Sequence, residues 1–270
     1  CDVKILTGFI EPHFFAGFSG GGKAVMPGMA ALSTIMRNHG YENLSHENAR
    51  WGVTTGNPVW EDVTEAAETA GSLFLLNVTM NRDKQITGVF AGDLRQAHGL
   101  GVHQAREESM AQVSRLYDLV ITSNAGYPLD LNLYQTVKGL SAAAQVVKPG
   151  GHILAAADCW DGIPDHGEFG RLLSSSDSPE ELLDTCRSAD PPIRDAWQAM
   201  ILCQICKKAH IHLYSENLTD RQIESAFMTA VKDMAGHVAH LIRSTGEKDF
   251  TVCVLPQGPL TIPFYNSEIC

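Results

Sequence analysis

Strand-like and helix-like segments alternate along most of this chain of 270 residues. The apolar, β-branched run at 118–126 (DLVITSNAG) leads into 131–147 (LNLYQTVKGLSAAAQVV), whose apolar residues recur with helical spacing, and then into a second strand-like run at 150–159 (GGHILAAADC). Two strands joined through a helix run parallel in one sheet, and the helix covers that sheet. We therefore expect an α/β protein with mainly parallel sheets covered by helices.

The alternation is interrupted by a long helix-like stretch, 94–113, and then begins again. We therefore expect two domains, 1–112 and 113–270, of which the second is a compact α/β domain. The first starts at Cys1 and runs at once into the strand-like segment 3–10 (VKILTGFI). This start predicts that an upstream segment has been removed and that some strands of the first domain belong to it.

The charge and cysteine content narrow the class of function. A formal net charge of -11, spread along the chain, argues against nucleic acid and anionic membranes as partners and favours small-molecule chemistry. No apolar run is long enough to span a bilayer. Seven cysteines at irregular spacing are typical of reduced thiols, so we expect the protein in the cytoplasm.

The glycine-rich stretch 17–28 (GFSGGGKAVMPG) reproduces the G-x-x-x-x-G-K spacing of a phosphate-binding loop. In that motif a serine or threonine follows the lysine and binds magnesium, whereas Ala24 follows Lys23 here. Pro27 would also disturb the helix that such a loop opens. A phosphate-loop nucleotidase is therefore a disfavoured alternative, and the lysine is presented for another purpose.

Three side chains near the N-terminus could act together, namely His13, Lys23 and His39. Glycines just before the lysine permit backbone shapes closed to other residues and let a bulky ligand approach the main chain. Spacing alone leaves a second interpretation open, in which 20–22 form a flexible turn and both histidines satisfy local hydrogen bonds.

Several motifs in the same order resemble the nickel-pincer lactate racemase family. They are the PH, AGFSGGGK, MPG and NH elements between Gly8 and His39, ITGVFAGD at 86–93, DLVITSNAGYPLDLNLYQTVKG at 118–139, and VLPQGPLTIP at 254–263. The resemblance covers nearly the whole chain. It implies a cofactor that is a pyridinium-3-thioamide-5-thiocarboxylic acid mononucleotide, in which two sulfurs and a ring carbon hold nickel.

By this resemblance Lys23 is the covalent attachment site, through a thioamide bond, and His39 is the protein ligand of nickel. Gly20, Gly21 and Gly22 would lie against the cofactor. An imidazole nitrogen suits nickel in a tetragonal or square-planar site. Gly22 stands where some members of the family carry arginine, so the identity of the 2-hydroxy acid stays open.

The resemblance also implies the substrate-handling residues. His13 would be one of two catalytic histidines, since a histidine that titrates near neutrality suits a base that takes a hydroxyl proton. Gln135 and Lys138 lie three residues apart, hence on one face of the expected helix. By the resemblance they would face the substrate, with Lys138 contacting its carboxylate and Gln135 forming a hydrogen bond nearby. Without the resemblance, Lys138 would be an ordinary surface lysine.

The implied activity is racemisation or epimerisation of a small 2-hydroxy acid by hydride transfer through a 2-keto acid. The family's second catalytic histidine and its substrate arginine have no match here, so we expect this chain alone to be inactive and free of the nickel-pincer nucleotide. Cofactor-synthesis proteins are the implied partners, and homo-oligomerisation stays open. A binding module that keeps the fold without metal is the alternative from another class.

Three other groups suggest chemistry only weakly. Cys203 and Cys206 precede two histidines, 210 and 212, but no second cysteine pair completes a zinc pattern, and we expect a helix and strand with ordinary packing. Asp158, Asp161, Asp165 and His166 form an acidic loop after a strand, which we interpret as solvated. His237 and His240 are expected on one face of a helix.

Overall fold

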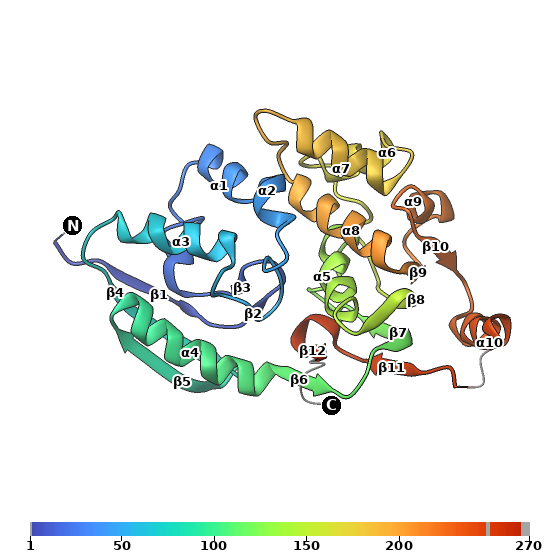
Figure 1. The fold of residues 1–270 in the computed structure, drawn as a ribbon, viewed down its shortest axis with the longest axis horizontal. Helices are drawn as coiled ribbons and strands as arrows, with labels where there is room; N and C mark the ends of the chain where they lie inside the picture. Colours follow the sequence, from blue (N-terminus) through green and yellow to red (C-terminus); the bar gives the residue numbers. More distant parts are fainter. Residues whose placement is uncertain (1, 247–248, 266–270) are drawn as a thin grey trace. The chain divides into compact units, whose positions relative to one another are not determined.

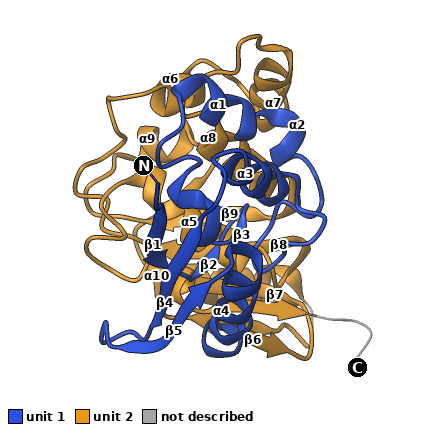
Figure 2. Cartoon of the chain, turned by 90° about the vertical axis from the view of Figure 1, so that its left-hand side faces the viewer, with its two compact units in different colours: residues 1–110 blue, residues 111–270 orange. Residues whose placement is uncertain are grey.

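A computed structural model describes residues 2–246 and 249–265. The chain divides into two compact units, unit 1 with residues 1–110 and unit 2 with residues 111–270 (Figure 2). The sequence prediction placed the division after residue 112. Each unit has its own sheets and helices, and each is described by itself below (Figure 1).

Unit 1 contains a three-stranded sheet of order β1-β4-β5, in which β1 runs parallel to β4 and β5 antiparallel to it. A small antiparallel pair, β2 and β3, adjoins the glycine-rich stretch. The elements are β1 (Ile5–Phe9), β2 (Pro12–His13), β3 (Gly17–Phe18), the 3₁₀ turn η1 (Gly21–Ala24), α1 (Leu32–Asn38), α2 (Tyr41–Leu44), α3 (Pro58–Glu68), β4 (Phe74–Met80), β5 (Ile86–Gly92) and α4 (Leu94–Ser109).

Helices α3 and α4 pack against one face of the three-stranded sheet. Leu6 and Leu75 from the strands meet Ala67 of α3 and Leu94 and Ala97 of α4 in one buried cluster. Alternate strand residues point away from this cluster, because successive side chains of a strand face opposite sides. Those residues are apolar yet exposed, and they include Ile5, Phe9, Phe74, Leu76, Met80, Ile86 and Val89.

The start of α3 was readable from sequence, since Asn57 accepts hydrogen bonds from the amides of Val59 and Trp60 as an N-cap and Pro58 occupies the first helical position. The end of α4 was not. The predicted helix 94–113 stops at Ser109, and 110–113 form strand β6 instead. That strand pairs with β12 near the other end of the chain, a partner that no local pattern reveals.

Unit 2 is built on a parallel sheet of order β10-β9-β8-β7-β11, which confirms the predicted α/β class. Its elements are β6 (Met110–Val113, which starts at the last residue of unit 1), β7 (Tyr117–Ser123), α5 (Leu133–Ala143), β8 (Val147–Ala156), α6 (Phe169–Ser174), α7 (Pro179–Ser188), α8 (Ala196–Lys208), β9 (His210–Tyr214), α9 (Asp220–Glu224), β10 (Thr229–Val231), α10 (Met234–Thr245), β11 (Val252–Leu255), η2 (Gly258–Leu260) and β12 (Ile262–Tyr265).

Side chains from both sides of the sheet fill the core of unit 2. Leu119 of β7 and Leu154 of β8 pack with Val231 and with Leu241 of α10 in one buried cluster. On the predicted helix α5, Leu133, Val137 and Leu140 are buried, as the helical spacing of the sequence requires. No helix of the described residues is long and apolar enough to cross a membrane.

Candidate functional site

The glycine-rich stretch forms a short 3₁₀ turn rather than the start of a long helix. The turn covers Gly21–Ala24, and the next helix, α1, starts only at Leu32. A phosphate loop needs the N-terminus of a helix directly after its glycines, where unpaired amides bind the anion. The geometry therefore agrees with the sequence argument against a nucleotidase.

The glycines are required by close contacts with the protein itself. Gly17, Gly20 and Gly21 all have positive φ angles, which L-residues rarely adopt. A Cβ at Gly17 would lie 2.1 Å from the carbonyl oxygen of Val53, and one at Gly20 would lie 2.6 Å from Oδ1 of Asn77. The backbone freedom that the sequence predicted is present, but these glycines make room for protein atoms.

His39, at the C-terminal end of α1, is a half-buried imidazole near a lysine. Burial and, second, the positive charge of Lys23 lower its pKa from 6.5 to about 4. The ring is therefore neutral at pH 7 and keeps a nitrogen lone pair, which a metal ligand needs. The same effect shows that Lys23 lies within electrostatic reach of His39.

The tautomer of His39 follows from its neighbour Asn38. The Asn38 amide nitrogen donates to the Val59 carbonyl at 3.2 Å and to Oδ2 of Asp62 at 2.7 Å. This fixes which end of the amide faces the ring, so Oδ1 of Asn38 accepts from Nδ1 of His39 at 2.8 Å. The hydrogen then sits on Nδ1, and Nε2 is the ring nitrogen suited to bind a metal.

His13 lies near His39 with one aromatic ring between them. Phe15 makes edge-to-face contacts with both, at 4.6 Å between ring centres for His13 and 4.8 Å for His39. Nδ1 of His13 accepts from the Ala16 amide at 3.2 Å, so Nε2 carries the hydrogen in this tautomer. Unit 1 therefore brings together His13, Lys23 and His39.

Unit 2 holds the other two predicted residues on α5. Gln135 and Lys138 are both half-buried and three residues apart, so they share one face of the helix. Asn132 caps this helix by accepting from the Gln135 amide at 3.1 Å. The neighbouring Tyr134 accepts from Nε1 of Trp197 at 2.8 Å, which anchors the first turn of α5 to α8.

The weak cysteine motif has ordinary packing, as expected. Burial raises the pKa of the Cys206 thiol to about 12 and that of Cys203 still higher, so neither is a thiolate at neutral pH. Within residues 2–246 and 249–265, no three histidine, cysteine, aspartate or glutamate side chains surround a point that could hold a metal ion. Asp158 and Asp161 instead bind the amide groups of Asn217 and Asn132.

A chain of three histidines in unit 2 was not anticipated. Nδ1 of His152 lies 3.0 Å from Nε2 of His212, and Nδ1 of His212 lies 3.0 Å from Nε2 of His237. His210 and His240 flank this histidine chain, with ring centres 5.3 Å from His152 and 6.5 Å from His237. The five positions come from β8, β9 and α10, so no single motif contains them.

Comparison with known proteins gives the family. The lactate racemase C-terminal domain matches residues 113–262, and the lactate racemase N-terminal domain matches residues 1–52. The chain belongs to the lactate racemase family. A curated lactate racemase from Thermoanaerobacterium thermosaccharolyticum is 37% identical over 259 residues, and one from Lactiplantibacillus plantarum is 39% identical over 261. The alignment covers 95% of this chain but 60% of each relative.

Solved structures agree with this family membership. The lactate racemase apoprotein from T. thermosaccharolyticum superimposes with a TM-score of 0.90 at 36% identity, covering 97% of this chain and 63% of that one. A Thermotoga maritima protein shares the fold alone, with a TM-score of 0.68 at 14% identity. The chain thus spans about three fifths of the length of the racemases that it matches.

The residues present fit the nickel cofactor that the family resemblance implies. The amine of Lys23 could form the tether, and the neutral His39 has its Nδ1 hydrogen held by Asn38, which leaves Nε2 as the donor for a metal. A hydrogen bond of this kind to the far ring nitrogen is a regular feature of metal-binding histidines. Sequence reasoning singled out both residues but not Asn38, whose amide nitrogen is held by Val59 and Asp62, 21 and 24 residues further along the chain.

Proposed function

We propose that this chain carries part of the active site of a racemase or epimerase of lactate-type 2-hydroxy acids, with the nickel-pincer nucleotide attached to Lys23. The observation that carries the proposal is the pairing of a lysine amine with a half-buried, neutral and oriented imidazole at His39. Membership of the lactate racemase family supports the same reaction class.

When bound, the cofactor would take hydride from the substrate carbon and return it to either face. The residues of this chain then have separate tasks. Lys23 would tether the ring, and His39 would complete the nickel coordination through Nε2. His13 would exchange a proton with the substrate hydroxyl. To accept that proton at Nε2, the ring must carry its hydrogen on Nδ1, and Nδ1 then no longer accepts from the Ala16 amide at 3.2 Å.

Gln135 and Lys138 would bind the substrate carboxylate from α5. A lysine ammonium supplies the positive charge, and the neighbouring amide supplies a hydrogen bond that fixes orientation. Neither contact distinguishes lactate from larger 2-hydroxy acids, because all of them share the carboxylate and the hydroxyl.

The proposal extends to partners and location. We infer that cofactor-synthesis proteins load Lys23 and that the protein acts in the cytoplasm, where such a reduced, cysteine-bearing chain is typical. The 270-residue chain alone should be inactive. The residues proposed for this site include one histidine for proton transfer, His13, whereas a planar keto acid needs a proton-transfer group at each of its two faces.

The test is a racemisation assay on the full-length protein, produced together with cofactor-synthesis proteins and supplied with each enantiomer of a panel of 2-hydroxy acids. Nickel-dependent conversion of at least one acid in both directions is expected, and His13→Gln should abolish it. A loaded protein that binds 2-hydroxy acids but converts none would favour the binding-module alternative.

A further inference from the structure

Side chains from three elements hold the backbone that leads to Lys23. Asn77 of β4 accepts the amide hydrogen of Gly21 through Oδ1 at 2.8 Å, and its own amide nitrogen donates to the Leu6 carbonyl at 3.3 Å. His98 of α4 lies 2.9 Å from the Ser19 carbonyl oxygen through Nε2. Trp60 of α3 stacks on His98. No motif of the sequence pointed to these three residues.

His98 must donate in its contact with Ser19. A carbonyl oxygen can only accept, so Nε2 carries the hydrogen in this contact. His98 is 4% exposed, and this burial lowers its pKa, with the Ser19 bond acting in the opposite direction. The ring is thus neutral, and its single hydrogen is committed to the backbone two residues before Gly21.

The stack limits where the glycine turn can lie. The rings of Trp60 and His98 are 4.5 Å apart with an interplanar angle of 21°. A Cβ at Gly21 would lie 2.8 Å from the His98 ring and 2.9 Å from the Trp60 ring, so the turn rests directly on both. The Lys23 amide closes the same turn by donating to the Gly20 carbonyl at 3.1 Å.

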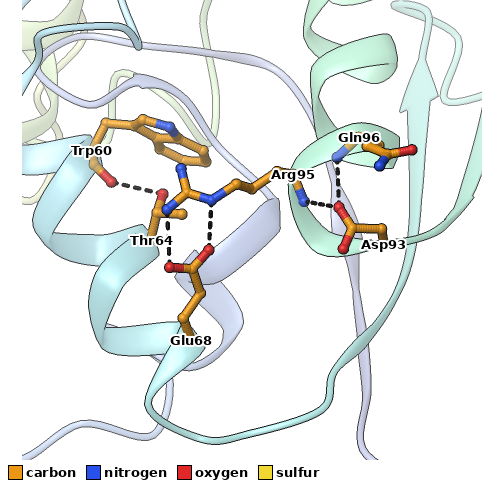
Figure 3. Close-up of polar contacts among 6 residues, drawn as sticks. All are labelled: Trp60, Thr64, Glu68, Asp93, Arg95 and Gln96. Carbon is orange, nitrogen blue, oxygen red and sulfur yellow. Dashed lines mark hydrogen bonds and ion pairs between the residues drawn. The ribbon is translucent and has the colours of Figure 1, made fainter.

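A cavity borders the glycine turn on one side. Gly22, Trp60, Thr64, Arg95 and His98 are among the residues that line it. Figure 3 shows Arg95 held by both carboxylate oxygens of Glu68, at 2.5 and 2.9 Å, across the space between α3 and α4. The turn borders this cavity at Gly22 and rests on the two rings at Gly21, so the ring contact and the Ser19 and Gly21 hydrogen bonds position it together.

We propose that His98 is a positioning residue for Lys23. Through the Ser19 carbonyl, and with Trp60 as its stacking partner, it sets the 19–23 backbone from which the Lys23 side chain extends. The structural part concerns the chain as it stands, whereas the catalytic consequence rests on the proposed function. His98 itself does not touch substrate or cofactor in this account.

Two substitutions separate its hydrogen bond from its ring. His98→Phe keeps an aromatic ring against Trp60 and loses the donor, whereas His98→Gln keeps a donor within reach of the Ser19 carbonyl. His103→Gln is the control, because His103 lies on the same helix with its side chain 74% exposed. The 270-residue chain is used for each variant, so no cofactor is required.

The measurements are amide hydrogen exchange at residues 20–24 and the rate at which an acylating reagent labels Lys23, followed from pH 6 to 9. Loss of a buried hydrogen bond predicts exchange about tenfold faster in His98→Phe, with a changed labelling rate and pH profile at Lys23. His98→Gln should restore most of both, and His103→Gln should match the original chain.

The thermal midpoint distinguishes positioning from general stability. If His98→Phe and His98→Gln lower the midpoint equally and raise exchange throughout unit 1, His98 is an ordinary core residue and the proposal is wrong. Exchange and labelling unchanged in a folded His98→Phe would overturn it as well. If both readouts change as expected but the loaded natural protein does not racemise 2-hydroxy acids, the positioning role stands and the proposed function fails.

Discussion

Asn38 Oδ1 lies 2.8 Å from Nδ1 of His39, and the Asn38 amide is itself held by Asp62. This relay runs from the first turns of α3 to the end of α1 and fixes the ring by a chain of named contacts. For the nickel-binding role proposed for His39, this means that the ring is oriented before any metal binds.

The relay predicts that Asn38→Ala weakens nickel retention without removing any metal ligand. Outer partners of metal-binding histidines typically contribute about 10- to 100-fold in metal affinity. Nickel loss from the loaded protein during dialysis against a chelator, followed by metal analysis, measures the effect. Ser45→Ala is the control, because its exposed hydroxyl donates to the nearby Glu42 carbonyl and takes no part in the relay. Equal retention in Asn38→Ala and the control would contradict the relay.

The glycine geometry predicts opposite effects for two similar substitutions. Gly17→Ala should destabilise unit 1, because its φ is +79° and the new Cβ would lie 2.1 Å from the Val53 carbonyl oxygen; a cost of about 2 kcal/mol or more is expected. Gly99→Ala, inside α4 with no atom near the new Cβ, should stabilise by about 0.5–1 kcal/mol. Urea unfolding of both variants measures this, and a loss of stability in Gly99→Ala would refute the packing described here.

The histidine chain predicts a stability that falls as the solution becomes acidic. Burial first, and then His237, His152 and His210, lower the pKa of His212 from 6.5 to about 4. The unfolded chain therefore binds more protons between these values, so the stabilisation is complete above pH 6.5 and is lost as the pH falls toward 4.

The pKa values of His152 and His237 are lowered as well. For His152, the charge of Asp118 opposes the effects of burial and of the neighbouring histidines. Urea midpoints at pH 7.5, 5.5 and 4.5 should show a flatter dependence in His212→Leu than in the original chain. The lowered pKa of His39 reduces the stability of both proteins in acid by the same amount. The difference between their two pH curves therefore reports on the histidine chain. Parallel curves would contradict it.

Local sequence patterns predicted most elements of the fold. They succeeded where the residues of a segment determine its secondary structure without a distant partner. The cap at Asn57 and the apolar spacing of α5 are examples. The strand at 110–113 was missed because its partner, β12, lies about 150 residues away. Segments of this kind are set by tertiary pairing, which overrides local preference.

The candidate site likewise contains residues that the sequence predicted and residues that it did not. Lys23, His39 and His13 were predicted as site residues because they lie within one continuous run of motifs, and the structure groups them in unit 1. Asn77 and His98 were missed, since they reach the glycine turn from 56 and 79 residues away in sequence. Their residue types are ordinary for a core, and only the folded chain reveals what they hold.

The central claim is that Lys23 carries the nickel-pincer nucleotide beside His39, and the most direct test is the mass of the peptide that contains Lys23. The natural protein would be produced together with cofactor-synthesis proteins, digested and analysed alongside its nickel content, with Lys23→Ala and His39→Ala as variants. For the unchanged protein, a mass increment on Lys23 and about one nickel per chain are expected. Lys23→Ala should lose both. His39→Ala should keep the mass increment but retain less nickel. Racemisation by a protein whose Lys23 is unmodified, or full activity in Lys23→Ala, would contradict the account.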